Sequence, residues 1–230
     1  LLDEEVLGPA GTLSYGLGRI NNGEIKVVHK GDIAGSSGFY DAGSDNAGGD
    51  MKGLVIGTSC TSIGSQAFYY CNGLTGSLTI PDSVTTIGSY AFYSCNSLTS
   101  LTIGNSVTTI GSSAFFYCNG LTGDLVIPDS VTSIENSAFA YCSGLTDSLV
   151  IPNSVTTIGG SAFGGCSGLT TAYLAPPLAN VGSGAFYGSG LTTVYAKDAA
   201  TNGWTEGAGQ TVGGKTGVTV IDWANYPVTP

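Results

Sequence analysis

The middle of the chain is a run of closely similar segments. The segment at 65–88, SQAFYYCNGLTGSLTIPDSVTTIG, recurs at 89–111, 112–135, 136–159 and 160–182, and a sixth, decayed copy begins at residue 183. Spacings of 24, 23, 24, 24 and 23 residues separate the phenylalanines of the repeated Ala-Phe pair: Phe68, Phe92, Phe115, Phe139, Phe163 and Phe186. A constant period of this length is typical of a solenoid, in which each repeat forms one coil.

A coil of this length cannot bury its own apolar residues, so the coils must stack and share a core. Stacked coils lie about 4.8 Å apart in the direction of strand pairing, so equivalent residues form ladders along the axis. Besides the phenylalanines, we expect four inward ladders: Leu74/Leu98/Leu121/Leu145/Leu169, Ile80/Ile103/Ile127/Ile151/Leu174, Val84/Val107/Val131/Val155/Leu178 and Ile87/Ile110/Ile134/Ile158/Val181.

Within one coil the pattern predicts three sides. Residues Ser77–Ile80 alternate polar and apolar, as a half-buried strand does, and Pro81-Asp82-Ser83 favours a turn. Val84–Ile87 is a second extended segment, and Tyr90–Cys95 is predicted as a helical or 3₁₀ turn. The 24-residue copies carry one extra residue before the strand (Gly76, Gly123, Asp147), interpreted as a looser loop or a bulge. The expected fold is a β-rich α/β solenoid with a parallel concave sheet.

The repeated pattern LTxLxIPxSVTTIGxxAFxxC resembles the BspA-like, or Treponema-type, leucine-rich repeat family, over roughly residues 53–196. The resemblance implies a right-handed solenoid on the surface of bacteria of the mouth and gut, or of some parasitic protists. It also implies adhesion to host proteins or to other cells, an extracellular or cell-surface location, and a possible lipid anchor upstream. It supplies no catalytic residues.

The two ends of the chain differ from the repeats, and a solenoid needs terminal units that cover its open core. Residues 1–52 are expected to form an N-terminal cap, with a hairpin around Asn22-Gly23 followed by a Gly/Asp-rich loop. The repeats themselves span 53–196. Residues 197–230 are expected to form the C-terminal cap, in which Trp204 and Trp223 could plug the last coil.

Charge excludes several classes of partner. Charged residues make up 10% of the chain and the net charge is −10, whereas soluble domains usually carry about 25% charged residues. All six basic residues lie outside 53–196: Arg19, Lys26, Lys30, Lys52, Lys197 and Lys215. Nucleic acids and anionic membranes need clustered basic residues, so we expect neither as a partner. No apolar run approaches the roughly 18 residues of a membrane span, and the lack of an initiator Met or signal peptide suggests a mature or trimmed chain.

The cysteines follow the repeat. Cys71, Cys95, Cys118, Cys142 and Cys166 share one repeat position, and Cys60 stands in the Val84 ladder. Neighbouring cysteines of a ladder point the same way with Cβ atoms about 4.8 Å apart, beyond the roughly 3.5–4.5 Å of a disulfide. A zinc site needs ligands that converge on one point. We therefore expect buried thiols that pack as small hydrophobic groups.

Few other residues offer chemistry. The single histidine, His29, lies on the expected hairpin, and the repeats contain no His, Lys or Arg to serve as a base for serine catalysis. We therefore expect neither an enzyme nor a cofactor. The acidic loop could wrap a calcium ion through Asp41, Asp45, Asn46 and Asp50, since oxygen ligands suit calcium. Its spacing does not match an EF-hand loop, and a solvated loop is the alternative.

The outward strand positions are the main candidate binding surface. They pair as Ser77/Thr79, Ser100/Thr102, Asp124/Val126, Ser148/Val150, Thr171/Tyr173 and Thr193/Tyr195. From them we select Thr79, Thr102, Asp124, Val126, Tyr173 and Tyr195 as candidate ligand-binding residues. A second column near the turn (Tyr70, Ser94, Tyr117, Tyr141, Gly165) could bind a partner or merely shield the rim of the core, since tyrosine favours interfaces.

These observations lead to two hypotheses for function. The first is a non-enzymatic surface protein that binds a protein or glycan through its solenoid, since solenoids offer long binding surfaces. The second is a structural spacer or self-associating scaffold. An enzyme in the N-terminal segment would need a pocket around His29 and ranks third.

Overall fold

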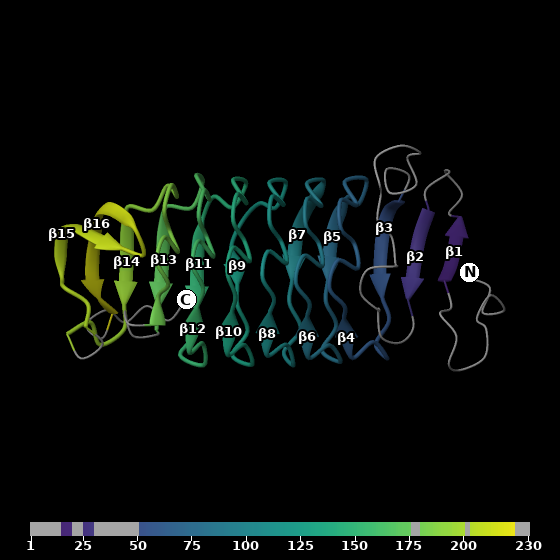
Figure 1. Ribbon diagram of the computed structural model, residues 1–230, viewed down its shortest axis with the longest axis horizontal. Helices are drawn as coiled ribbons and strands as arrows, with labels where there is room; N and C mark the ends of the chain where they lie inside the picture. Colours follow the sequence, from purple (N-terminus) through teal and green to yellow (C-terminus); the bar gives the residue numbers. More distant parts are fainter. Residues whose placement is uncertain (1–14, 20–24, 30–50, 176–179, 201–202, 224–230) are drawn as a thin grey trace.

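The repeats stack as coils along one long axis (Figure 1). The computed structural model describes residues 15–19, 25–29, 51–175, 180–200 and 203–223. One side of the stack, here called the strand face, carries the following strands: β3 (Met51–Ile56), β5 (Gly76–Thr79), β7 (Leu98–Thr102), β9 (Leu125–Val126), β11 (Ser148–Ile151), β13 (Thr171–Leu174), β14 (Thr193–Ala196) and β16 (Lys215–Asp222). Strands β9, β11, β13, β14 and β16 form one parallel run, and β5 pairs with β7.

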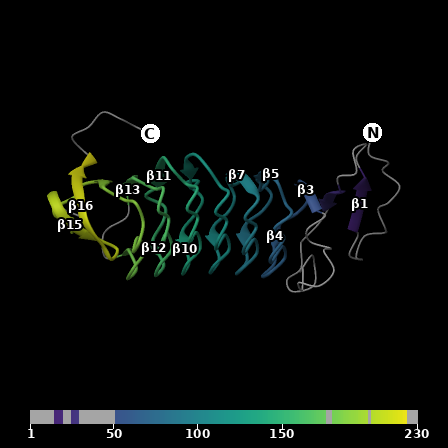
Figure 2. The ribbon, with the colours of Figure 1, turned by 90° about the horizontal axis from the view of Figure 1, so that it is seen from above.

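A second parallel sheet runs along another side of the coils (Figure 2). Its strands are β4 (Ser62–Ile63), β6 (Thr86–Ile87), β8 (Thr109–Ile110), β10 (Ser133–Ile134) and β12 (Thr157–Ile158). The threonine before each strand ties neighbouring coils together. Thus the Thr108 hydroxyl donates to the carbonyl oxygen of Thr85 at 3.1 Å, and the Thr132 hydroxyl donates to that of Thr108 at 3.1 Å. The Thr side chains therefore reinforce the backbone ladder at every step.

The third side, here called the turn side, differs from the helical or 3₁₀ turn expected at Tyr90–Cys95. The described residues contain no α-helix. Alternate N–H groups point to the next coil instead. The Tyr90 N–H donates to the carbonyl oxygen of Ser112 at 2.8 Å, and the Phe92 N–H donates to that of Ala114 at 2.7 Å. The N–H groups between them close tight turns within the coil. An α-helix directs its N–H groups along its own axis, so alternate N–H groups could not pair sideways with the neighbouring coil.

This alternation requires left-handed backbone at two positions of each coil. The first column comprises Gln66, Tyr90, Ser113, Ser137 and Ser161, with φ between 54° and 60°. The second column comprises Tyr70, Ser94, Tyr117 and Tyr141, with φ between 58° and 63°, and the glycines Gly165 and Gly188. Non-glycine residues at positive φ are uncommon and cost free energy, so pairing between coils offsets local strain.

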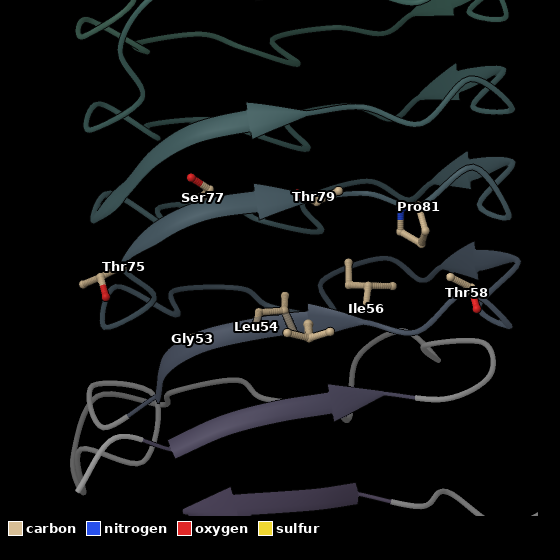
Figure 3. Close-up of a pocket in the computed structure, with 9 residues that line it drawn as sticks. Gly53, Leu54, Ile56, Thr58, Thr75, Ser77, Thr79 and Pro81 are labelled. Carbon is tan, nitrogen blue, oxygen red and sulfur yellow. The ribbon is translucent and has the colours of Figure 1, made fainter. Parts of the chain in front are cut away.

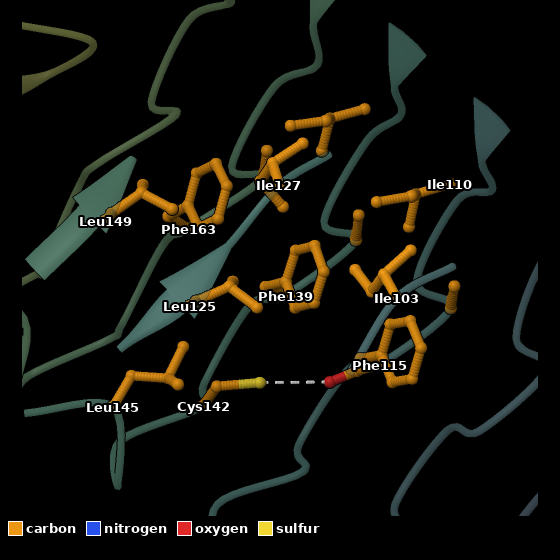
Figure 4. Packing of buried hydrophobic residues seen from close by; sticks show 14 of the residues in the cluster. Ile103, Ile110, Phe115, Leu125, Ile127, Phe139, Cys142, Leu145, Leu149 and Phe163 are labelled. Atoms are coloured by element: carbon orange, nitrogen blue, oxygen red, sulfur yellow. Dashed lines mark hydrogen bonds between the residues drawn. The ribbon is translucent and has the colours of Figure 1, made fainter. Parts of the chain in front are cut away.

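The expected inward ladders are buried. The Leu74 and Ile80 ladders are at most 6% exposed throughout, and the six phenylalanines are fully buried. Phe92, Phe115 and Phe139 stack at 5.2 Å between ring centroids, with planes 5° apart, and Figure 4 shows the rings of Phe115 and Phe139. Leu178 lies outside the described residues, and Val181 is only partly buried. A further ladder, centred on Leu78, Leu125 and Leu149, adds the middle residue of each strand to the core.

Strands also pair at both ends of the stack. β1 (Tyr15–Arg19) and β2 (Ile25–His29) form the expected antiparallel hairpin, and β2 pairs in parallel with β3. At the other end, β15 (Gly207–Val212) pairs with β16 in antiparallel fashion and forms the outer edge. The turn at Asn22-Gly23 lies outside the described residues. The extra residue Gly76 lies at a register shift between β5 and β7 with φ of 80°, which agrees with the expected bulge.

Candidate functional site

The strand face presents the side chains expected to point outward. Thr79 and Thr102 are exposed, and Val126 is 61% exposed, an unusual value for an aliphatic side chain. Tyr173 and Tyr195 are half-buried. The alternation arises because successive residues of a strand point to opposite faces, and the inward residues between them fill the core.

Some polar side chains of the strand face form hydrogen bonds from one coil to the next. The Asp124 carboxylate accepts hydrogen bonds from the Ser148 N–H at 2.9 Å and from the Ser148 hydroxyl at 2.8 Å. The Ser100 hydroxyl donates to that of Ser77 at 2.7 Å. Asp124 therefore holds two coils together, and a ligand would have to compete with Ser148 for its oxygen atom.

Aromatic rings gather at the C-terminal end of the strand face. The rings of Tyr173 and Tyr195 are stacked, with centroids 4.8 Å apart and planes 10° apart, because β13 and β14 pair in register. Trp223 contacts Tyr173 edge-on at 5.7 Å. Trp204 is buried, whereas Trp223 joins this cluster. The only signal in the sequence for the place of Trp223 is that it follows Ile221 by two residues, and Ile221 of β16 pairs with Tyr195 of β14.

An open hollow of about 490 Å³ lies at the N-terminal end of the same face, between β3 and β5 (Figure 3). These strands belong to different sheets. Its walls are uncharged: Gly53, Leu54, Val55, Ile56, Thr58, Thr75, Ser77, Thr79 and Pro81. Thr79, selected from the sequence, therefore borders a concave feature. The β3 residues were missed, since their repeat is incomplete.

The turn side carries a second group of aromatic rings, here called the aromatic ridge: Tyr69, Tyr70, Tyr90, Tyr93, Phe116, Tyr117 and Tyr141. Of the candidate column, Tyr70, Tyr117 and Tyr141 are 40%, 44% and 51% exposed, whereas Ser94 is buried. Tyr69, Tyr93 and Phe116 were missed. The signal that could have found them is an aromatic residue directly after the core phenylalanine in three successive copies.

The cysteines are buried thiols, as predicted. The Cys118 thiol donates to the Phe92 carbonyl oxygen at 3.1 Å, and Cys95, Cys142 and Cys166 repeat this contact. Burial raises the pKa of Cys95, Cys118 and Cys142 well above the usual value, and raises the pKa of Cys166 to about 12. These thiols remain protonated near neutral pH, so they are poor nucleophiles and poor metal ligands.

Several other candidates fall outside the described residues. The calcium candidates Asp41, Asp45, Asn46 and Asp50 do so entirely, and only the backbone of His29 is described, on β2. Among the described residues, no three His, Cys, Asp or Glu side chains gather closely enough to hold a metal ion. Within the same residues, no helix has the length and apolar character needed to cross a membrane.

Comparisons with known proteins agree with this architecture. The chain resembles the crystal structure of a leucine-rich repeat protein from T. pallidum, with 23% identity, a TM-score of 0.52, and coverage of 83% of this chain and 86% of that one. It also resembles a leucine-rich repeat protein from Bacteroides ovatus, with 22% identity and a TM-score of 0.55. That match covers 80% of this chain and 60% of the Bacteroides protein.

At these identities the likeness shows the fold alone. No curated protein matches the chain in sequence. The family described as BspA type leucine-rich repeat region matches residues 47–148 and 146–202 in six copies. This match covers more than half of the sequence and all of the stacked coils, and the chain therefore belongs to the BspA-type leucine-rich repeat family.

Proposed function

We propose that the chain is a non-enzymatic binding and adhesion protein of the cell surface, and that it recognises a protein or glycan through the strand face. Membership of the BspA-type family supports this role. So does the shape of a stacked solenoid, which offers one long surface along its axis.

The observation that carries the proposal is the stacked pair Tyr173 and Tyr195, with Trp223 against it. Tyrosine and tryptophan offer a large contact area and a polar tip at little entropic cost, which is why they concentrate at binding hot spots. Here the three rings stand at one end of a face whose other outward residues are mainly Ser, Thr and Val. That contrast favours the C-terminal end as the anchor point.

A catalytic role fits the repeats poorly. Residues 53–196 contain no His, Lys or Arg, and the buried thiols of Cys95, Cys118 and Cys142 have a raised pKa. A hydroxyl nucleophile needs a neighbouring base. The strand face therefore supports contact and stacking rather than bond cleavage.

The test is a binding screen of the purified chain against immobilised host matrix proteins and a glycan array. We expect at least one saturable partner, with an affinity that changes little between about 50 and 300 mM salt, because charge steering by basic residues is absent. Binding of that partner is then compared between the parent and Tyr173→Ala/Tyr195→Ala. The matched control is Tyr187→Ala, which removes a 71% exposed tyrosine from another side of the last coil. If no partner binds while the chain self-associates in sedimentation experiments, the scaffold hypothesis replaces this one.

A further inference from the structure

The aromatic ridge is distinct from the strand face and begins with a stack along the solenoid axis. Tyr69 and Tyr93 stack at 4.8 Å with planes 26° apart, and Tyr93 and Phe116 stack at 4.8 Å with planes 2° apart. Each of these half-buried rings stacks its face on the neighbouring ring, so the stacked faces are not open to a ligand. Burial, with Tyr70 and Tyr90 nearby, raises the pKa of Tyr93. The stack therefore covers the core rim and supports a second set of rings.

In that second set, Tyr70 and Tyr141 are turned across the stack, whereas the Tyr117 ring lies 24° from Phe116 and continues the stack. The Tyr70 ring is 89° from Tyr69 and 63° from Tyr93, and the Tyr141 ring is 65° from Phe116. Tyr70, Tyr117 and Tyr141 remain 40–51% exposed. Because the stacked rings face along the axis, rings turned by this much direct their faces elsewhere. The turned rings of Tyr70, Tyr90 and Tyr141 thus stand in the first, second and fourth coils, and Tyr117 adds an exposed ring, parallel to the stack, in the third.

The four segments that carry the ridge contain no charged residue. Residues 65–72, 89–96, 112–119 and 136–143 contain no Asp, Glu, Lys or Arg, and their polar groups are hydroxyls and amides of Ser, Tyr, Gln and Asn. The adjacent Glu135 carboxylate is engaged, since it accepts hydrogen bonds from the Ser112 N–H and hydroxyl at 3.0 and 2.9 Å. A surface without cations disfavours nucleic acids and anionic lipids, and the net charge of −10 repels polyanions.

The second column of residues at positive φ, which includes Tyr70, Tyr117 and Tyr141, also shows where the ridge ends. In the fifth coil, Gly165 replaces the tyrosine, and a Cβ atom there would meet the Tyr141 ring at 2.6 Å. The Tyr141 ring therefore rests on the backbone of Gly165. Gly188 follows in the sixth coil. The ring faces end at this point, so the ridge is a bounded surface rather than a feature of every coil.

We propose that the aromatic ridge binds a neutral, linear, β-linked hexopyranose chain that lies along the solenoid axis. The negative face of an aromatic ring attracts the polarised C–H groups on the flat face of a pyranose. Hydroxyl and amide groups beside the rings match the sugar hydroxyls. Coils repeat about every 4.8 Å, close to the length of one pyranose unit, so a chain along the axis advances by about one sugar for each coil.

The test measures binding of the β-linked hexopyranose oligomers cellohexaose, mannohexaose and chitohexaose by calorimetry, with β-linked hexamannuronic acid as the charged counterpart of mannohexaose. The variant is the triple substitution Tyr70→Asn, Tyr117→Asn and Tyr141→Asn. Asparagine tolerates positive φ better than most residues, and these positions have φ of 59°, 63° and 61°, so the fold should persist. Unchanged circular dichroism and unfolding midpoint check this. Tyr187→Ala is the control, because Tyr187 is exposed but lies outside the ridge.

We expect at least one neutral hexasaccharide to bind, and the triple variant to weaken it by about tenfold or more, while Tyr187→Ala and Tyr173→Ala/Tyr195→Ala leave it unchanged. Absence of binding by all three neutral sugars up to about 1 mM overturns the proposal. So does tighter binding of hexamannuronic acid, or binding that survives the triple variant. Ridge-dependent binding to phosphatidylcholine vesicles without sugar binding would assign the ridge to membranes instead. Because the strand-face variant is measured in parallel, failure here leaves the strand-face proposal intact.

Discussion

The thiol of Cys142 donates a hydrogen bond to the carbonyl oxygen of Phe115 in the preceding coil, at 3.1 Å (Figure 4). The same oxygen atom accepts the Cys118 N–H at 3.3 Å. Each such carbonyl thus receives one donor from its own coil and one from the next. The cysteine ladder is therefore explained by packing and hydrogen bonding, since a thiol fills a small apolar site and still satisfies a buried oxygen atom.

Alkaline pH should destabilise the solenoid through these thiols. The folded-state pKa of Cys166 is raised to about 12, whereas an unfolded thiol titrates near about 8.5. The stabilisation is complete below the unfolded value and is lost as pH rises toward the folded value. The free energy of unfolding, from urea titrations between about pH 8.5 and 12, should fall less steeply with pH in Cys166→Ser, by up to about 1.4 kcal/mol per pH unit. Identical slopes for the two proteins would contradict the account.

The thiols should also resist modification in the folded protein. Denatured, unreduced protein should titrate close to six thiols, since all six cysteines are buried thiols, and the native protein should react slowly because thiolate is the reactive form. Thr102→Cys provides a control with an exposed thiol that reacts fast. Three disulfides in the mass spectrum would reject the ladder arrangement.

Core and surface positions of the coils should respond very differently to truncation. Phe115→Ala should lower the free energy of unfolding by about 3–5 kcal/mol, because it opens a cavity between Phe92 and Phe139, which stack on either side. Thr102→Ala, at an exposed strand position, should stay within about 0.5 kcal/mol of the parent. Urea denaturation compares the two. Equal effects would mean that the strand faces are assigned the wrong way round.

The left-handed positions of the turn side give a separate test. Ser137 has φ of 56°, and a β-branched side chain is poorly tolerated there. Ser137→Val should destabilise the protein by about 1–3 kcal/mol, whereas Ser137→Gly should be neutral or stabilising by less than about 1 kcal/mol. Thr99→Val, at an exposed residue of β7, is the matched control and should change little. The backbone description is wrong if valine at residue 137 is as well tolerated as glycine.

Period and alternation were sufficient to predict the core. The inward ladders repeat because each coil packs the same residue against its neighbours, so Leu74, Val84 and Phe115 could be placed from spacing alone. The outward direction of Thr79 and Val126 followed from the same alternation. These features depend on contacts between equivalent positions, which a repeat displays directly in its sequence.

Other features depend on pairing that one repeat does not display. Tyr90–Cys95 contains no helix-breaking residue, so local propensity could not reveal that alternate N–H groups serve the next coil and that Tyr90 and Ser94 adopt positive φ. Trp223 joins Tyr173 only because β16 aligns with β14. The hollow beside Thr79 likewise depends on the junction between β3 and β5.

The most direct test of the central claim is the affinity of Tyr173→Ala/Tyr195→Ala for the partner found in the binding screen, measured beside Tyr187→Ala. Loss of a central aromatic anchor typically costs about 2 kcal/mol, so the double variant should bind about thirtyfold more weakly while Tyr187→Ala binds as the parent does. An affinity that ignores the double variant, or that collapses between about 50 and 300 mM salt, would contradict recognition through the strand face.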